Sequence, residues 1–246
     1  MMDTQQSRRY RAIFFDMFGT IASGSTDDEA HMHLMESLSD RYNLTTEPPL
    51  LLRQFNTALR ESSSGTETAW VHHLELATRT FEGLLGDHGH PVRPEDGTWF
   101  NDEYLRVHQS FVRLLPGARE ALEELSRSGL HIGLIADCDT RYLDRQLCWL
   151  DIVSLIDSRT TSEETGARKP DERIFRAALR KAQCDPQQAI FVCEDVECGI
   201  YGAKAVGMTT VLLDMGMART ELSKADFVAS HPTRLVKILV ELAYSP

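Results

Sequence analysis

The first residue that could do chemistry is Asp16, a carboxylate that directly follows the short apolar run at residues 12–15. Such a run predicts a strand that is buried on both faces. Open α/β sheets bind their ligands outside the carboxyl ends of the strands, and Asp16 would lie there. Gly19 allows the chain to turn sharply and a ligand to approach the backbone. The same residues also fit an ordinary turn after a strand, so Asp16 alone does not decide the function.

Three later stretches place further charged side chains where they could join Asp16. They are residues 136–140 and 193–199, which follow predicted strands, and residues 166–171, which precede a predicted helix. Among their charged residues, the candidates for the site are Asp137, Lys169, Glu194 and Asp195. One carboxylate can attack as a nucleophile, and a lysine can neutralise charge on the attacking or leaving group. Two or three carboxylates that face one point bind a hard cation such as Mg²⁺. The set therefore fits nucleophilic catalysis beside a divalent cation.

The elements that must position these residues alternate in the second part of the chain. Strands are predicted at residues 12–15, 130–136, 153–156, 189–193, 209–213 and 227–229, and helices at 118–128, 142–150, 171–182, 200–206 and 233–243. This alternation predicts βαβ units with right-handed crossovers and a parallel sheet. The predicted fold class is α/β, with a Rossmann-like doubly wound parallel sheet.

Between the first strand and residue 118 the apolar residues follow a helical period only. Helices are predicted at about residues 26–42, 51–59, 70–85 and 99–114. Four amphipathic helices can bury their apolar stripes against each other as a small bundle. We therefore predict a sheet core of residues 1–22 and 115–246, interrupted by a helical insertion at residues 23–114, which we call the cap.

The composition limits the classes of partner. The chain has 246 residues, 42% of them hydrophobic, and a formal net charge of −11. This charge opposes binding to nucleic acid or to an anionic membrane. No window approaches the roughly 18 apolar residues of a membrane span, and no signal peptide is visible. The five cysteines form no CxxC pair, so we expect reduced thiols in a cytoplasmic protein. From the net charge we expect no nucleic-acid or membrane partner.

Taken together, the motifs resemble those of the haloacid dehalogenase (HAD) superfamily, the aspartate-nucleophile phosphatases and dehalogenases, in its helical-cap (C1, subfamily I) type. Asp16 to Thr20 matches the DxxGT frame of the first motif of that family. Residues 166–175, with Lys169, resemble its lysine motif, and residues 191–208 resemble its acidic motif in the Glu-Asp variant. Each motif alone is weak, but their order around a helical insertion makes the resemblance strong, and it covers nearly the whole chain.

The resemblance implies a role for each matching position. Asp16 would be the nucleophile and, with the backbone carbonyl of Phe18, a ligand of Mg²⁺. Glu194 and Asp195 would complete the Mg²⁺ site, and Lys169 would bridge Asp16 and the transferred group. The positions expected to contact substrate are Gly19, Thr20, Ala136, Asp137 and Lys169. The resemblance further implies a small phosphorylated substrate and a monomer or homodimer.

Two positions depart from the phosphatase pattern. Phe18 stands where phosphatases of the family usually carry a second Asp as general acid and base, a function worth about 10²–10⁴-fold in rate. Ala136 stands where they carry a Ser or Thr that hydrogen-bonds the phosphoryl group, and losing a hydrogen bond to a charged group costs roughly 1.5–3 kcal/mol. Both departures predict a phosphatase of low activity.

Phe18 also leaves two alternatives open. Haloacid dehalogenases of the family carry an aromatic residue there, because a halide leaves without a proton. Those enzymes, however, hold the substrate carboxylate with an Arg early in the cap and work without metal, whereas residues 21–40 contain no Lys or Arg. We therefore expect a Mg²⁺-dependent phosphatase, with a 2-haloacid dehalogenase as the first alternative. A HAD-like scaffold with little or no catalysis, kept for binding, is the second.

Overall fold

The computed structural model describes residues 9–23, 27–63, 72–214 and 224–244. Its centre is a six-stranded sheet in the order β5-β4-β1-β6-β7-β8, in which every neighbouring pair is parallel. The strands are β1 (Ala12–Phe15), β4 (His131–Ala136), β5 (Ser158–Thr161), β6 (Ala189–Cys193), β7 (Thr209–Leu213) and β8 (Phe227–Ala229). The predicted α/β fold with a parallel sheet is confirmed.

Strand β1 lies inside the sheet between β4 and β6, and its four side chains are all buried. Ile13 and Phe15 belong to the apolar core on one face of the sheet, and Ala12 and Phe14 to the core on the other. After β1 the chain runs outward through β4 and β5, and then returns to place β6 on the other side of β1. Ligand sites of open sheets lie where the strand order reverses in this way, so Asp16 follows the strand at that point.

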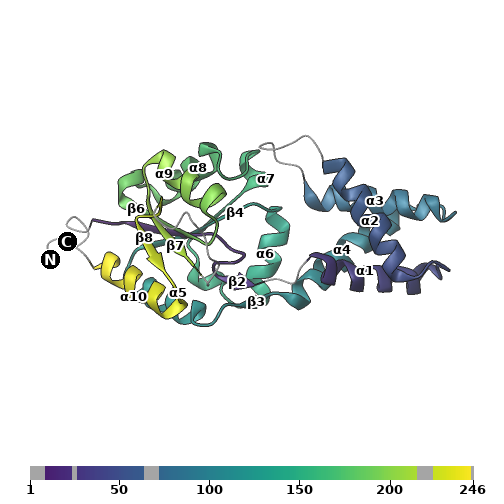
Figure 1. Cartoon of the computed structure of the whole chain (residues 1–246), viewed down its shortest axis with the longest axis horizontal. Helices are drawn as coiled ribbons and strands as arrows, with labels where there is room; N and C mark the ends of the chain where they lie inside the picture. The colour runs from purple at the N-terminus through teal and green to yellow at the C-terminus, as the bar shows by residue number, and fades with distance from the viewer. Residues whose placement is uncertain (1–8, 24–26, 64–71, 215–223, 245–246) are drawn as a thin grey trace.

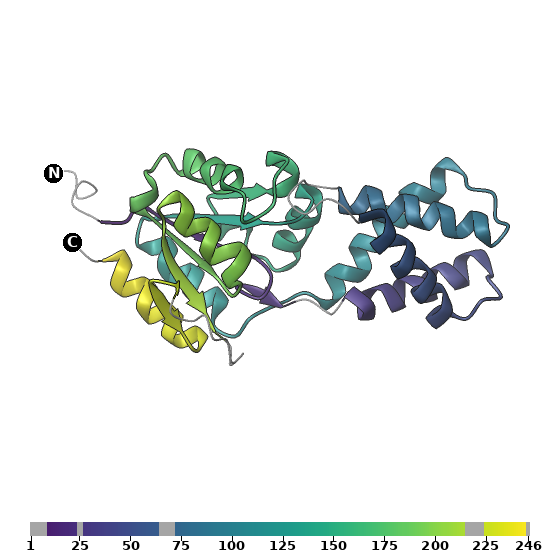
Figure 2. The same cartoon turned by 45° about the horizontal axis from the view of Figure 1, so that its top comes forward.

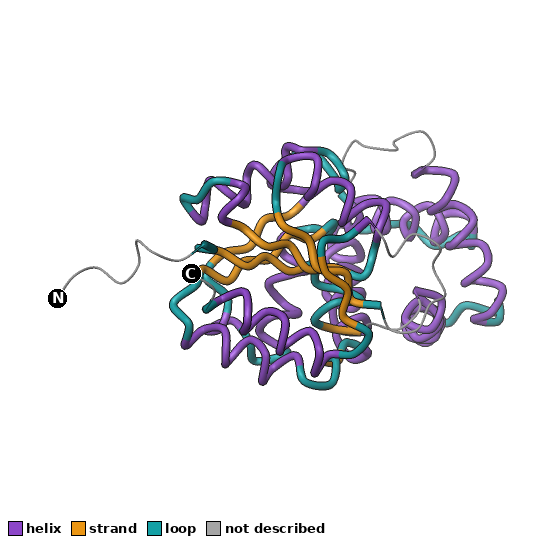
Figure 3. Tube along the Cα trace, turned by 60° about the vertical axis from the view of Figure 1, so that its left-hand side comes forward, coloured by secondary structure: helices purple, strands orange, loops and turns teal. Residues whose placement is uncertain are grey.

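Helices cover both faces of the sheet, as Figure 3 shows. They are α5 (Ala118–Arg127), α6 (Thr140–Trp149) and α10 (Pro232–Ala243), which contribute to the core shared with Ile13, and α8 (Glu172–Ala182) and α9 (Tyr201–Val206), which contribute to the core shared with Phe14. Shorter turns are η1 (Val153–Leu155), α7 (Ser162–Thr165), η2 (Pro186–Gln188) and η3 (Val196–Ile200). No described helix is both long and apolar enough to cross a membrane.

A separate helical bundle lies to one side of the sheet (Figures 1 and 2). Its helices are α1 (Asp27–Tyr42), α2 (Pro48–Ser63), α3 (His73–Asp87) and α4 (Pro94–Phe111). It has an apolar core of its own, in which the rings of Phe81 and Phe100 stack 4.4 Å apart. Two-residue strands β2 (Ala22–Ser23) and β3 (Arg113–Leu114) pair antiparallel where the chain leaves and re-enters the sheet region. The division into core and cap at residues 22/23 and 114/115 stays a prediction, which this arrangement supports.

The structure corrects three predicted elements. The strand predicted at residues 153–156 is not formed, because Val153–Leu155 form the turn η1. The strand of this region is β5, four residues with the sequence Ser-Arg-Thr-Thr. Helix α4 begins at Pro94, where a loop was predicted, because the Asp96 carboxylate accepts from the backbone N–H of Arg93 and caps the helix. Helix α2 begins at Pro48, before its predicted start at about residue 51, since proline is tolerated in the first turn of a helix.

Candidate active site

Asp16 and Lys169 meet at the carboxyl end of β1. Lys169 Nζ lies 2.5 Å from Asp16 Oδ1, although the two residues are 153 positions apart, and it also donates to the carbonyl oxygen of Ile135 at 3.2 Å. Their side chains are only 6% and 16% exposed. The predicted pairing of these two side chains is therefore present in the structure.

Burial and the charges of nearby groups shift the pKa values of Asp16 and Lys169. Burial raises the pKa of Asp16, against the opposing attraction of Lys169. Burial alone would lower the pKa of Lys169, but the negative charges of Asp16 and Asp137 outweigh it and raise that pKa. Lys169 is therefore a cation held against a carboxylate in a place with little water, where electrostatic interactions are stronger than in solvent.

Asp137 fixes the loop that carries Lys169. Its Oδ1 accepts from the backbone N–H of Lys169 at 3.0 Å and from the hydroxyl of Ser162 at 2.7 Å. One carboxylate oxygen thus joins the end of β4, the first turn of α7 and the lysine loop. The structure gives Asp137 a positioning role, and its predicted contact with substrate stays a prediction.

The turn after Asp16 is shaped by Gly19. Gly19 has a φ of 77°, and its N–H donates to the carbonyl of Ala22 at 2.8 Å. A Cβ added at Gly19 would lie 2.3 Å from Cδ of Glu194, so the Glu194 side chain lies directly against this turn. Only glycine leaves room for that approach, and it brings one predicted metal ligand beside the backbone of residues 18 and 19.

We expect Gly19→Ala to lower Mg²⁺-dependent turnover by about 10²-fold, because displacing a catalytic group by about 1 Å costs that much. The backbone strain of a positive φ should also cost about 1–2 kcal/mol of stability. Gly89→Ala is the matched control, since Gly89 has a φ of 75° with nothing within 4 Å of an added Cβ. Urea unfolding should show similar losses for both variants. Equal turnover of the two would show that Glu194 has no part in catalysis.

Asp195, which follows β6, caps the turn η3. Its Oδ1 accepts from the backbone N–H of Cys198 at 2.8 Å and so caps η3, while the residue as a whole is exposed. Among the described residues, Asp16, Glu194 and Asp195 do not form a group with ligand atoms all within 4.8 Å of one another. Mg²⁺ usually takes only one or two carboxylates and keeps several waters, so carboxylates and a backbone carbonyl still suit this ion. The Mg²⁺ site stays a prediction.

A cavity of about 350 Å³ lies beside this site, between sheet core and cap. Phe18, Asp137 and Tyr142 line it from the core, and Tyr104 and His108 from α4. Phe18 and Tyr142 have ring centroids 5.9 Å apart, and Tyr104 stacks on His108 at 3.9 Å. The sequence contains no motif for these aromatic residues, and Tyr104 falls within the cap helix predicted at residues 99–114.

A family model described as haloacid dehalogenase-like hydrolase matches residues 13–213. The chain belongs to this family. It is 33% identical over 173 residues, 70% of each chain, to the ribulose-1,5-bisphosphate 5-phosphatase of Halopiger xanaduensis. It is 25% identical over 240 residues, 94% of each chain, to the glyceraldehyde 3-phosphate phosphatase of Pyrococcus furiosus. The 2-haloacid dehalogenase structure from Pseudomonas syringae pv. Tomato DC3000 has a TM-score of 0.72 at 21% identity, covering 94% of this chain and 99% of that one, which shows a shared fold.

Thr20 and Ala136 of this hydrolase are buried, at 4% and 1% exposed. Ala136 lies in the apolar core, so no hydroxyl is offered at the end of β4. Hydroxyls lie instead on the neighbouring strand end, where Thr161 pairs in register with Ala136 and bonds the Thr140 hydroxyl at 2.6 Å. The substrate contacts expected of Thr20 and Ala136 stay predictions.

Cys138 and Cys193 are poorly suited to act as nucleophiles in this HAD-like hydrolase. Cys138 and Cys193 are buried, and burial raises the pKa of both thiols. A thiol is a much weaker nucleophile than a thiolate. The carboxylate of Asp16 is thus the better candidate to attack a substrate.

Proposed function

We propose that this HAD-family hydrolase is a phosphatase that uses Asp16 as its nucleophile on a small phosphorylated metabolite. The observation that carries the proposal is the buried ion pair between Asp16 and Lys169 at the carboxyl end of β1, beside a cavity of about 350 Å³. The names of the two relatives, both phosphatases of sugar phosphates, support the same reaction class. A panel of phosphate esters and 2-haloacids, each with and without Mg²⁺, tests it.

In the proposed reaction the Asp16 carboxylate attacks phosphorus. A bond forms between its oxygen and the phosphoryl group as the bond from phosphorus to the leaving oxygen breaks. Lys169 stabilises the negative charge on the transferred group, and water then releases phosphate and restores Asp16. Asp16, the Phe18 carbonyl, Glu194 and Asp195 would hold a Mg²⁺ ion, which supplies Lewis-acid stabilisation of the phosphoryl oxygens.

Phe18 sets the proposed choice of leaving group. An alkoxide needs a proton as it leaves, and Phe18 offers none at the family's acid position. The phenolate or carboxylate released from an aryl or acyl phosphate departs as a stable anion without a proton. The apolar part of such a substrate could lie against Phe18 and Tyr142, whose rings line the cavity. We therefore propose weak hydrolysis of aryl or acyl phosphates and weaker action on sugar phosphates. The relatives' names favour sugar phosphates, so the ratio of these rates is informative.

Phe18→Asp is expected to raise turnover of a sugar phosphate by up to about 10²-fold, because it introduces the missing acid. The gain on p-nitrophenyl phosphate should be smaller, since nitrophenolate needs little protonation. The measurement is the steady-state rate of wild type and variant on both substrates with Mg²⁺, with Phe18→Leu as the control that removes the ring without adding an acid. An equal gain on both substrates would contradict the leaving-group argument.

One observation favours the dehalogenase alternative, namely the aromatic ring of Phe18 at the cavity wall. A 2-haloacid also carries a carboxylate, which needs a cation to bind it. The described residues that line the cavity include no Lys or Arg. A phosphoryl group could instead be held by a Mg²⁺ ion at Asp16, Glu194 and Asp195, so we rank phosphoryl transfer first. Halide release from 2-haloacids without Mg²⁺, and no phosphate release, would reverse this order, and no turnover of either class would favour the binding scaffold.

A further inference from the structure

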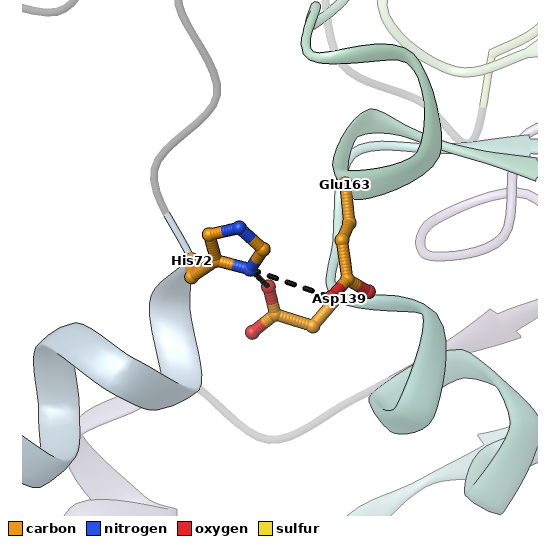
Figure 4. Close-up of side chains that lie close together, drawn as sticks. All are labelled: His72, Asp139 and Glu163. Atoms are coloured by element: carbon orange, nitrogen blue, oxygen red, sulfur yellow. Dashed lines mark ion pairs between the residues drawn. The ribbon is translucent and has the colours of Figure 1, made fainter.

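A second cluster of ligand-type side chains lies where the cap meets the core (Figure 4). His72 directly precedes α3, Asp139 precedes α6, and Glu163 lies in α7. One ligand atom of each residue lies within 4.8 Å of the other two. His72 Nδ1 is 3.3 Å from Glu163 Oε1 and 3.8 Å from Asp139 Oδ1. Among the described residues, this is the one group of three that comes so close.

The carboxylates of Asp139 and Glu163 each accept a hydrogen bond from a backbone N–H group. Asp139 Oδ2 accepts from the N–H of Leu74 at 2.8 Å, and Glu163 Oε2 accepts from the N–H of Thr140 at 2.6 Å. In each case one oxygen is anchored, and the other faces His72. Metal sites position their carboxylate ligands in this way, through hydrogen bonds to the oxygen that does not bind the ion.

The oxygen of Asp139 that faces the cluster lacks a hydrogen bond. The Asp139 side chain is only 7% exposed, and its buried Oδ1 accepts no hydrogen bond within the described part of the chain. Leaving a buried polar atom unsatisfied costs about 1–3 kcal/mol, and more for a charged group. Burial accordingly raises the pKa of Asp139. A cation at the shared point would satisfy this oxygen.

We propose that His72, Asp139 and Glu163 bind one divalent transition-metal ion of the Zn²⁺ class. Ligands of a tetrahedral Zn²⁺ at roughly 2.0–2.2 Å from the metal lie about 3.4 Å apart, close to the separations between His72 and the two carboxylates. An imidazole nitrogen with two carboxylates suits Zn²⁺ and its neighbours better than Mg²⁺ or Ca²⁺, which prefer oxygen ligands. His72 is half exposed, so water can complete the coordination.

The ion would join the cap to the core. His72 and Leu74 belong to the cap side, whereas Asp139 and Glu163 follow β4 and β5 of the sheet. Leu74 and Asp139 also line the cavity beside Phe18, so the ion would hold one edge of that cavity closed. This site does not depend on the proposed phosphatase reaction, because it shares no residue with Asp16 and its partners.

The test is Zn²⁺ binding to the full chain, measured by titration calorimetry at neutral pH in excess Mg²⁺. Wild type should bind one Zn²⁺. His72→Gln and Glu163→Gln should each weaken binding by more than about tenfold, since even changes behind a metal ligand cost 10–100-fold. Zn²⁺ should also raise the melting temperature of wild type, and should raise that of either variant less. Cooperative thermal unfolding of both variants in the absence of Zn²⁺ is the check that they fold.

Two control variants locate the bound ion. His33→Gln removes a histidine that lies 3.0 Å from Glu36 on α1 and belongs to no group of three among the described residues, and it should leave Zn²⁺ affinity unchanged. Asp16→Asn should also leave it unchanged. Absence of Zn²⁺ binding in wild type would overturn the proposal and leave a plain ion pair. So would a Zn²⁺ affinity in His72→Gln and Glu163→Gln that equals that of wild type. Loss of Zn²⁺ binding in Asp16→Asn would overturn it too, by placing the ion at the candidate active site.

Discussion

Asp16→Asn is expected to lower kcat by about 10⁴–10⁶-fold, the range found when one member of a catalytic triad is removed. An amide is a poor nucleophile, so no bond to phosphorus can form at position 16. The side chain keeps its shape, and its amide oxygen can still accept from Lys169 Nζ, which now bonds Asp16 Oδ1. We therefore expect the variant to fold and to bind substrate, with some loss of stability because the buried Lys169 cation loses its carboxylate partner.

The measurement for Asp16→Asn is the steady-state rate on p-nitrophenyl phosphate and on a sugar phosphate, with Mg²⁺. Asp28→Asn is the matched control, because Asp28 is an exposed aspartate of α1 that bonds only the Asn56 side chain among the described partners. It should retain wild-type rates. Turnover near the wild-type level in Asp16→Asn would remove the aspartate-nucleophile mechanism.

Lys169→Met should cost both activity and stability. Removing a preorganised charge that stabilises the transferred group lowers kcat by about 10²–10³-fold. Removing one partner of a buried ion pair costs up to about 3–5 kcal/mol, because the other charge is left uncompensated. Asp16 is 16% exposed and can take up a proton, so we expect the lower part of that range.

A double-mutant cycle separates the two effects. Asp16→Asn combined with Lys169→Met should unfold at a higher urea concentration than Lys169→Met alone, while remaining inactive, because no unpaired charge is left at the site. Lys181→Met is the control for losing an ion pair elsewhere, since Lys181 Nζ lies 2.6 Å from Glu164 and both side chains are partly exposed. Its cost should stay below about 1 kcal/mol. Equal stability of the single and double Lys169 variants would show that the charges are not coupled.

The sequence predicted the central strands and the residues that follow them most accurately. The apolar runs that became β1, β4 and β6 are buried on both faces, and such runs mark the central strands of a parallel sheet. Once these strands are parallel, the residues after them share one edge of the sheet. The meeting of Asp16 and Lys169 could therefore be predicted, although they are far apart in the chain.

The prediction failed where polar residues are buried with distant partners. Strand β5 contains Thr160 and Thr161, which are fully buried, but its sequence has no apolar residue and so no strand pattern. It lies at the edge of the sheet, and the Thr161 hydroxyl bonds the hydroxyl of Thr140, which lies 21 positions away in the chain. Such long-range pairs leave no periodic signal in the sequence.

The cluster at the cap boundary was missed for a related reason. His72 falls within the cap helix predicted at residues 70–85. In the structure it precedes α3 and lies between Asp139, which precedes α6, and Glu163, which lies in α7. The same holds for Tyr104 and Tyr142, which line one cavity from opposite sides of the boundary. Cap residues meet core residues only in the folded protein, so the cap residues that line the cavity cannot be inferred from motifs.

The central claim is that Asp16 carries the phosphoryl group during turnover. The most direct test is mass spectrometry of peptides from enzyme that is quenched in acid while it hydrolyses p-nitrophenyl phosphate with Mg²⁺. Because Phe18 cannot activate the water that releases phosphate, the phosphorylated enzyme should accumulate. We predict one added phosphoryl group on the peptide that contains Asp16, and none in Asp16→Asn. Sustained turnover with no phosphoryl group on that peptide would contradict the account.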